Sequence, residues 1–284
     1  MCGIVGYVGP KDCSEVLVNA LTKLEYRGYD SAGIAVFDNG EIKTVKTKGK
    51  LQDLKDKLAE VGTPKGHVGI GHTRWATHGA PALRNAHPME SHGGGFDISL
   101  VHNGIIENHK TLRTVLEKKG YVFKSETDTE VIPHLIASYY EGDLLTAVLA
   151  ALQHLEGTYG IACIHADEPG RIVGARNGSP LIVGVGKDEM FLASDFTAMV
   201  AYTNRVIYLN DGEVVDITQE NYSITDRHSN SIAKKVDEIT WELGAMEKSG
   251  FMHYMEKEIF EQPDSIARAM RGRIDEENAT AKLG

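Results

Sequence analysis

The sequence has 284 residues, of which 42% are hydrophobic and 25% charged, and its formal net charge is −10. This composition is typical of one large or two small globular domains, and the acidic balance argues against nucleic acid or an anionic membrane as the main partner. The sequence shows neither an apolar run of roughly 18–20 residues, the length of a membrane span, nor a secretory signal. Three widely spaced cysteines predict a reducing, cytoplasmic compartment without a disulfide framework.

Strand-like and helix-like patterns alternate in the first half of the chain. Residues 4–8 predict a strand, and Ser14 is expected to cap a helix whose apolar positions share one face. Residues 33–48 predict a hairpin around the turn Asp38-Asn39-Gly40. Further strands are expected at residues 68–72 and 98–101, and further helices at residues 51–58 and at residues 112–116, ended by Gly120.

The second half predicts two longer helices followed by strands in quick succession. Residues 206–217 predict another hairpin, turning at Asn210-Asp211-Gly212. Because the order is not a regular βαβ alternation, we expect a mixed or antiparallel sheet sandwich with helices outside. The helices are expected at residues 129–140 and 144–155, and the strands at residues 159–166, 171–176, 181–185 and 190–193.

The organisation changes after about residue 225. Residues 226–239 are polar and lack a strong period, whereas residues 242–257 predict a helix or an extended arm. Gln262-Pro263 is expected to break this arm before a last helix at residues 264–270. We therefore expect a domain over residues 2–225 and a connector arm over residues 226–284, the alternative being a simple C-terminal tail.

Cys2 is the first candidate for chemistry. Its small side chain beside the initiator methionine predicts that Met1 is removed, which leaves a cysteine with a free α-amino group. The ordinary pKa values are about 7.7–8 for the amine and about 8.5 for the thiol, so the amine can take the thiol proton near neutral pH. Cys2 is then a nucleophile with a built-in base. The alternative is that a cysteine stands at position two by chance.

Amide cleavage by a thiol also needs oxyanion donors and a clamp for the substrate. Asn103-Gly104 follows a predicted strand and offers a side-chain and a backbone donor, although Asn-Gly is also a common turn. Arg74 could hold a carboxylate or form a surface ion pair. Asp128 opens a predicted helix, where it could pair with an ammonium group or cap the helix. The opposite charges of Arg74 and Asp128 match the carboxylate and ammonium groups of a free amino acid.

Neither a metal nor a cofactor is expected. His72, His78, His87 and His92 are close in sequence but lack tight ligand spacing and the cysteine or carboxylate partners of a metal motif. The run Gly93-Gly94-Gly95 lacks the lysine and the strand–helix frame of a phosphate-binding loop, and is expected to be a loop.

Five segments together resemble one family, the glutaminase domains of the glucosamine-6-phosphate synthases. The resemblance covers about residues 2–225 and continues through residues 253–263, which look like the connector to a sugar-isomerase half. The segments are Cys-Gly-Ile-Val-Gly at 2–6, Glu-Tyr-Arg-Gly-Tyr-Asp-Ser-Ala-Gly at 25–33, Gly-His-Thr-Arg-Trp-Ala-Thr-His-Gly at 71–79, Val-His-Asn-Gly-Ile-Ile-Glu-Asn at 101–108 and Ser-Glu-Thr-Asp-Thr-Glu at 125–130.

The resemblance implies an α+β fold, the four-layer α/β/β/α sandwich of the N-terminal nucleophile hydrolases. It implies hydrolysis of L-glutamine to L-glutamate and ammonia through a thioester on Cys2, without cofactor or metal. The ammonia would pass to fructose-6-phosphate on a sugar-isomerase domain that this sequence does not include, in a homodimeric full-length enzyme.

The resemblance also implies a role for each matched residue. Asn103 and Gly104 would stabilise the oxyanion, while Arg74 and Asp128 would bind the α-carboxylate and the α-amino group of glutamine. Thr77, His78 and Gly104 would contact glutamine as well. Trp75 would lie in a mobile loop over the site, and Arg27 would support the nucleophile.

Two rival functions remain open. A related glutaminase domain serving purine, asparagine or glutamate synthesis would share the cysteine chemistry, but Arg27-Gly28-Tyr29-Asp30 and the connector favour the hexosamine enzymes. A non-catalytic glutamine-binding domain would keep Arg74 and Asp128 without turnover.

Overall fold

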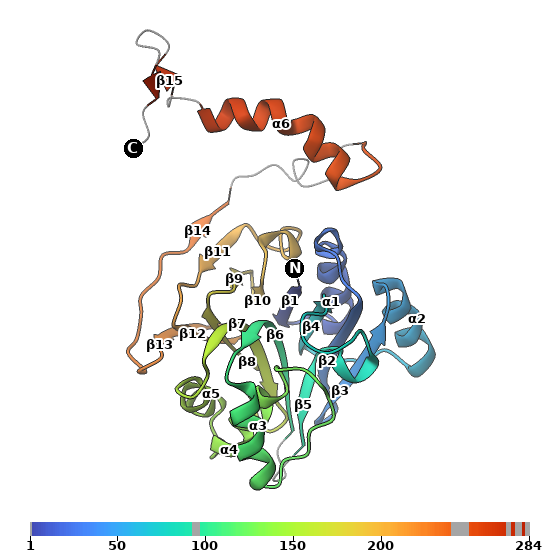
Figure 1. Cartoon of the computed structure of the whole chain (residues 1–284), viewed down its shortest axis with the longest axis vertical. Coiled ribbons are helices and arrows are strands. Elements are labelled where there is room, and N and C mark those ends of the chain that lie inside the picture. The colour runs from blue at the N-terminus through green and yellow to red at the C-terminus, as the bar shows by residue number, and fades with distance from the viewer. Residues whose placement is uncertain (1, 93–96, 240–249, 271–273, 276–279, 282–284) are drawn as a thin grey trace. The chain divides into compact units, whose positions relative to one another are not determined.

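The computed structural model describes residues 2–92, 97–239, 250–270, 274–275 and 280–281. The chain divides into two compact units, Met1–Ile239 and Thr240–Gly284. In the first unit two antiparallel sheets, of eight and six strands, are stacked between helices (Figure 1).

The eight-stranded sheet has the order β14-β11-β9-β10-β1-β4-β2-β3. The central strand β1 is Gly-Ile-Val-Gly-Tyr-Val, and all six of its residues are buried. It pairs with β4 so that Ile4 lies opposite His72. The strands are β1 Gly3–Val8, β2 Ser31–Asp38, β3 Glu41–Lys48, β4 Val68–Arg74, β9 Ile182–Val185, β10 Met190–Ala193, β11 Arg205–Tyr208 and β14 Asp237–Glu238.

The six-stranded sheet has the order β13-β12-β8-β7-β6-β5. Its long central pair, β6 and β7, places Asn103 opposite Gly160 and Gly104 opposite Tyr159. The strands are β5 Met89–Ser91, β6 Ile98–Ile106, β7 Gly157–His165, β8 Arg171–Asn177, β12 Glu213–Thr218 and β13 Tyr222–Asp226.

Helices cover the outer face of each sheet. α1 Cys13–Thr22 and α2 Leu51–Val61 pack on the eight-stranded sheet, whereas α4 Val131–Tyr139 and α5 Leu144–Leu152, with α3 His109–Lys118 beside α4, pack on the other (Figure 1). A core of buried aliphatic side chains, including Ile4, Ile70, Val101 and Ala162, joins the two inner faces. The layers are therefore α/β/β/α, which confirms the expected fold.

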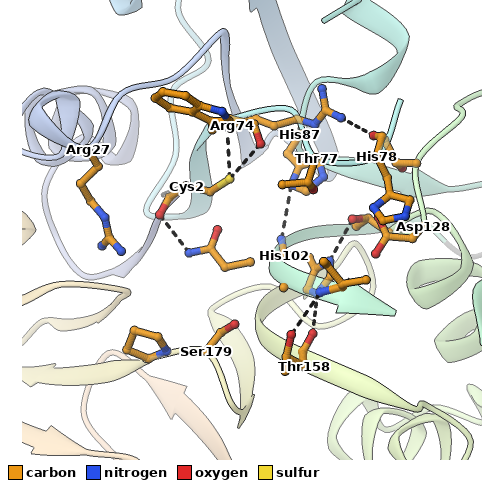
Figure 2. A pocket seen from close by; sticks show the side chains of 17 residues that line it. Cys2, Arg27, Arg74, Thr77, His78, His87, His102, Asp128, Thr158 and Ser179 are labelled. Atoms are coloured by element: carbon orange, nitrogen blue, oxygen red, sulfur yellow. Dashed lines mark hydrogen bonds between the residues drawn. The ribbon is translucent and has the colours of Figure 1, made fainter. Parts of the chain in front are cut away.

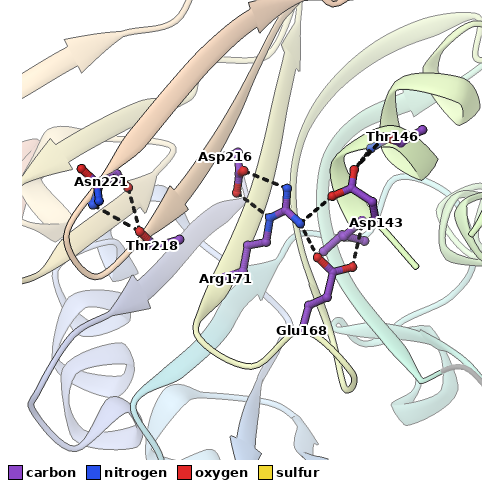
Figure 3. Close-up of polar contacts among 8 residues, drawn as sticks. Asp143, Thr146, Glu168, Arg171, Asp216, Thr218 and Asn221 are labelled. Atoms are coloured by element: carbon purple, nitrogen blue, oxygen red, sulfur yellow. Dashed lines mark hydrogen bonds and ion pairs between the residues drawn. The ribbon is translucent and has the colours of Figure 1, made fainter. Parts of the chain in front are cut away.

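An ion-pair network around Arg171 ties one helix to the six-stranded sheet (Figure 3). Arg171, on β8, donates to both carboxylate oxygens of Asp216 on β12, at 2.8 and 2.9 Å. It also binds Asp143 at the N-terminus of α5, at 2.9 Å, and Glu168 in the turn after β7. Asp143 in turn accepts from the Thr146 N–H, so one guanidinium fixes the start of α5 against the sheet.

Two local expectations are wrong. The side chain at the N-cap of α1 belongs to Asp12, which accepts from the Ser14 and Glu15 N–H groups. The Ser14 hydroxyl donates instead to the Pro64 carbonyl. The hairpin expected at residues 206–217 does not form, because β11 pairs with β9 in one sheet and β12 pairs with β8 in the other.

The second unit contains α6, Tyr254–Met270, and a short pair, β15 Ile274–Asp275 with β16 Thr280–Ala281. The helix continues through Pro263, so the expected break there is wrong. A proline removes one backbone hydrogen bond, but the turns on either side of it can remain helical. Residues 242–249 of the expected arm and the run Gly93-Gly94-Gly95 lie outside the described residues.

Among the described residues, no single helix has the length and apolarity of a membrane span. Only α4 and α5 taken together, with a bend of 120° between them, meet these criteria.

Candidate active site

A cavity of about 440 Å³ opens where the chain enters β1 and where β4 and β6 end (Figure 2). It collects residues that are far apart in the sequence. All nine residues that the sequence predicts for the site line it: Cys2, Arg27, Arg74, Trp75, Thr77, His78, Asn103, Gly104 and Asp128.

Cys2 is half-buried and directly precedes β1. Its sulfur accepts the Trp75 N–H at 3.1 Å and lies 3.5 Å from the Trp75 carbonyl oxygen. Burial raises the pKa of the thiol, so little thiolate forms at neutral pH without a base. Within the described part of the chain, no histidine nitrogen is hydrogen-bonded to this sulfur.

Asn103 and Gly104 lie inside β6, so the interpretation of Asn-Gly as a turn is wrong. The Asn103 side-chain nitrogen donates to the Cys2 carbonyl oxygen at 3.1 Å, which places an amide donor beside the nucleophile. Gly104 has φ +136°, and a Cβ there would lie 2.0 Å from the Thr158 carbonyl oxygen. Only glycine fits at this position without distorting the ladder between β6 and β7.

Arg74 is the last residue of β4 and is 4% exposed, which excludes a surface ion pair. Its Nη2 donates to the carbonyl oxygens of His78 and Gly79, at 2.5 and 3.1 Å. Nη1 lies 3.9 Å from the Asp30 carboxylate and makes no hydrogen bond to any described residue. A buried guanidinium whose Nη1 hydrogens are unpaired can donate hydrogen bonds to a substrate carboxylate.

Asp128 precedes α4 by three residues and does not cap it, since the N-cap position is Glu130. Its Oδ2 accepts the Ile106 N–H at 2.7 Å, and the residue is 4% exposed. The carboxylate is thus held against the end of β6 on the cavity wall, where it can pair with an ammonium group.

Trp75 and Arg27 form the rim near Cys2. The Trp75 side chain is 54% exposed, and its ring packs on Gly28, where a Cβ would lie 2.3 Å from a ring carbon. The Arg27 guanidinium donates to the Ser194 hydroxyl at 3.3 Å and pairs with Asp195 at 3.7 Å. Thr77 and His78 continue the wall along the loop after β4.

The sequence reasoning missed three buried histidines at this wall: His87 and His102 line the cavity, and His72 lies behind Asn103. His72 Nε2 bonds the Asn103 side-chain oxygen at 2.9 Å, and the rings of His72 and His87 are 4.3 Å apart. The His102 N–H donates to His87 Nδ1 at 3.5 Å. Burial lowers the pKa of His72 to about 3 and lowers those of His87 and His102, so all three are neutral. The sequence analysis considered His72 and His87 only as possible metal ligands. Across the described residues, no group of three or more His, Cys, Asp or Glu side chains could hold a metal ion.

The remaining residues of the cavity wall carry no sequence signal of their own, and three of them lie outside the five matched segments. These remaining residues are Ile105, Thr127, Thr129, Thr158, Ser179 and Pro180.

The chain is similar to known proteins of one kind. A family model described as "Glutamine amidotransferase domain" matches residues 72–201. The chain is 49% identical to the glutamine–fructose-6-phosphate aminotransferase [isomerizing] of Clostridium acetobutylicum, covering 96% of this chain and 45% of that protein. It is 50% identical to the protein of the same name from Thermus thermophilus, covering 100% of this chain and 46% of that protein.

A solved structure shares the fold. The glutamine phosphoribosylpyrophosphate amidotransferase of B. subtilis matches with a TM-score of 0.69 and 27% identity, over 81% of this chain and 50% of that one. The chain spans less than half the length of the curated relatives it matches.

Proposed function

We propose that the chain is a glutamine amidotransferase domain, as its similarity to that family suggests, that the cavity binds L-glutamine and that Cys2 hydrolyses its side-chain amide to L-glutamate and ammonia. The observation that carries this proposal is the set of side chains that line the cavity together with Cys2. An amide donor (Asn103), a buried cation (Arg74) and a buried carboxylate (Asp128) line the same space. These are the groups that cleavage of an amide in a free amino acid requires.

The two charged residues Arg74 and Asp128, which form the substrate clamp, select a free amino acid. Arg74 binds the α-carboxylate through its unengaged Nη1, and Asp128 binds the α-ammonium group. A cavity of about 440 Å³ falls within the range typical of small-molecule sites. Thr77 and His78 lie in the loop that follows Arg74 and line the cavity, so they contact the bound glutamine.

The first chemical step is attack of the Cys2 sulfur on the side-chain carbonyl carbon of glutamine. The α-amine of Cys2, freed by removal of Met1, takes the thiol proton, because no histidine among the described residues is hydrogen-bonded to the sulfur. The carbonyl oxygen becomes an oxyanion, which Asn103 and the Gly104 N–H stabilise.

The second step expels ammonia. The C–N bond breaks as the α-ammonium group returns its proton to the departing nitrogen, leaving a thioester on Cys2. The amine then takes a proton from water, whose oxygen attacks the thioester, and the C–S bond breaks to give L-glutamate and the restored thiol.

For the whole protein we propose that the ammonia serves glucosamine-6-phosphate synthesis from fructose-6-phosphate, in a homodimeric enzyme. Identities of 49–50% to aminotransferases named for fructose-6-phosphate, against 27% to the phosphoribosylpyrophosphate amidotransferase, favour this acceptor. In this proposal residues 2–225 are the glutaminase part and residues 226–284 lead toward a sugar-isomerase domain. The three free thiols suit the reducing cytoplasm.

The test is release of glutamate and ammonia from L-glutamine by the wild type, Cys2→Ala and Cys13→Ala. Cys13 is fully buried in α1 and serves as the matched control. We expect turnover by the wild type and by Cys13→Ala, and a loss of several orders of magnitude in Cys2→Ala. A folded wild type that binds glutamine without hydrolysing it would instead be a non-catalytic glutamine-binding domain.

A further inference from the structure

The Asn103 side chain bridges the two sheets of the sandwich. Asn103 lies on β6 of the six-stranded sheet, whereas one of its side-chain partners lies in the other sheet and the second directly precedes it. The amide nitrogen donates to the carbonyl oxygen of Cys2, which precedes β1, at 3.1 Å. The amide oxygen bonds Nε2 of His72, on β4, at 2.9 Å. One amide group thus fixes the oxyanion donor relative to the nucleophile.

The chemistry of the partners fixes which way this amide faces. The Cys2 carbonyl oxygen can only accept, so the NH₂ end of Asn103 must face it. The oxygen end then faces His72, whose Nε2 must carry the hydrogen. A flipped amide would oppose oxygen to oxygen at Cys2, and with the hydrogen on Nε2 it would also set N–H against N–H at His72.

His72 is itself rigidly placed. It lies inside β4, opposite Ile4 on one side and Gly33 on the other. Its ring is fully buried and packs against the His87 ring, with centroids 4.3 Å apart. Burial lowers the pKa of His72 to about 3, so the ring is a neutral donor throughout the physiological range.

We propose that His72 is a positioning residue of the glutaminase site, which orients the Asn103 amide so that its N–H₂ end faces the reacting carbonyl group. His72 does not touch the substrate and transfers no proton. The inference rests on the proposed function and deepens it, because it assigns a residue that holds the oxyanion donor in place.

The main variant is His72→Phe, which keeps an aromatic ring and removes the donor. We expect kcat to fall about 10–100-fold, because a misplaced catalytic group costs up to roughly 10²-fold in rate. KM should change less than about threefold, since the clamp residues are untouched. In His72→Gln the side-chain nitrogen stands as many bonds from Cα as Nε2 does, so this variant should recover part of kcat.

His165→Phe is the matched control. His165 is a buried histidine on β7 that stacks on Tyr140 and does not line the cavity. Its kcat should match that of the wild type, and thermal melting of all variants confirms that they fold.

A double-mutant cycle with Asn103→Ala separates positioning from general damage. Asn103→Ala alone should lower kcat by about 10²–10³-fold if it removes an oxyanion donor. Adding His72→Phe to it should cost nothing more, because the group that His72 orients is gone. Alkylation of Cys2 by iodoacetamide displaces iodide without forming an oxyanion, so its rate should be unchanged in His72→Phe.

Three results would overturn the inference: a kcat of His72→Phe equal to that of the wild type, additive losses in the double variant, or alkylation slowed as much as turnover. Failure of the proposed function looks different, because the wild type itself would then release no glutamate. A wild type that turns over glutamine while His72→Phe does so equally well would refute only the role of His72.

Discussion

The Trp75 N–H donates a hydrogen bond of 3.1 Å to the Cys2 sulfur, and this contact attaches the loop after β4 to the nucleophile. The same loop folds back on Arg74, whose guanidinium holds the His78 and Gly79 carbonyl groups. Asp30 accepts the Ala76 N–H from the other side. The substrate-binding loop is therefore built around the thiol, so binding and chemistry separate only in variants that leave its backbone in place.

Asp128→Asn is such a variant, because asparagine retains an oxygen for the Ile106 N–H and loses only the charge. We expect KM for glutamine to rise by roughly two orders of magnitude, since an unpaired buried charge partner costs about 2–5 kcal/mol. Arg74→Ala also removes the donor to the His78 and Gly79 carbonyl groups, so it should raise KM and lower kcat together. Steady-state kinetics check this, with the exposed Asp56→Asn on α2 as control. A fall in kcat at unchanged KM would contradict the clamp role.

Gly104→Ala should destabilise the protein by at least about 2 kcal/mol, because its Cβ would meet the Thr158 carbonyl oxygen at 2.0 Å in a backbone conformation that disfavours alanine. Gly40→Ala is the matched control: φ is +90° there and nothing lies within 4 Å of the added Cβ. Urea unfolding should show a clearly smaller decrease in the free energy of unfolding for Gly40→Ala than for Gly104→Ala. Equal losses would mean that the close approach of β7 is unimportant.

Three Asn-Gly or Asn-Asp-Gly segments show what the sequence could and could not predict. At Asn39-Gly40 both residues have positive φ and the expected hairpin forms between β2 and β3. At residues 210–212 the chain turns, yet the flanking strands join different sheets. At Asn103-Gly104 there is no turn at all. Turn residues set the local backbone, whereas strand partners are chosen by burial across the whole domain.

The same distinction applies to the site. Cys2, Arg74, Asn103 and Asp128 carry charge or reactivity that local motifs reveal. The role of His72 depends on a contact with Asn103 across two sheets, and no local pattern encodes it.

Stability should fall as the pH drops below about 6.5. Burial lowers the pKa values of His72, His87 and His102 below the ordinary 6.5, so the folded protein keeps them neutral while the unfolded chain takes up protons. The stability they contribute is present above pH 6.5 and is lost as the pH falls toward their folded values, at about 1.4 kcal/mol per pH unit for each group.

Urea unfolding at pH 7.5, 6.5 and 5.5 measures this slope. His72→Gln removes one buried imidazole and should flatten the slope, whereas His67→Gln, at an exposed position, should not. A free energy of unfolding that is constant between pH 6.5 and 5.5 would show that these rings are protonated in the folded state.

Retention of Met1, or an N-terminal tag, should abolish turnover while the protein still folds. The nitrogen of Cys2 is then an amide without a basic lone pair, and it cannot accept the thiol proton. Glutamate release is compared between protein with Cys2 exposed, checked by intact mass, and N-terminally tagged protein; a C-terminal tag is the control. Equal activity in all samples would require a base other than the α-amine.

The central claim, that Cys2 is the nucleophile toward glutamine, is tested most directly by labelling with a glutamine analogue that carries an electrophilic group at the side-chain carbonyl position. Cys13 and Cys163 are fully buried, and burial raises the pKa of both thiols. Peptide mapping should find one label, on Cys2, with glutamine slowing its addition and glutaminase activity lost in proportion. A label on Cys13 or Cys163, or full glutamate release from protein labelled at Cys2, would contradict the account.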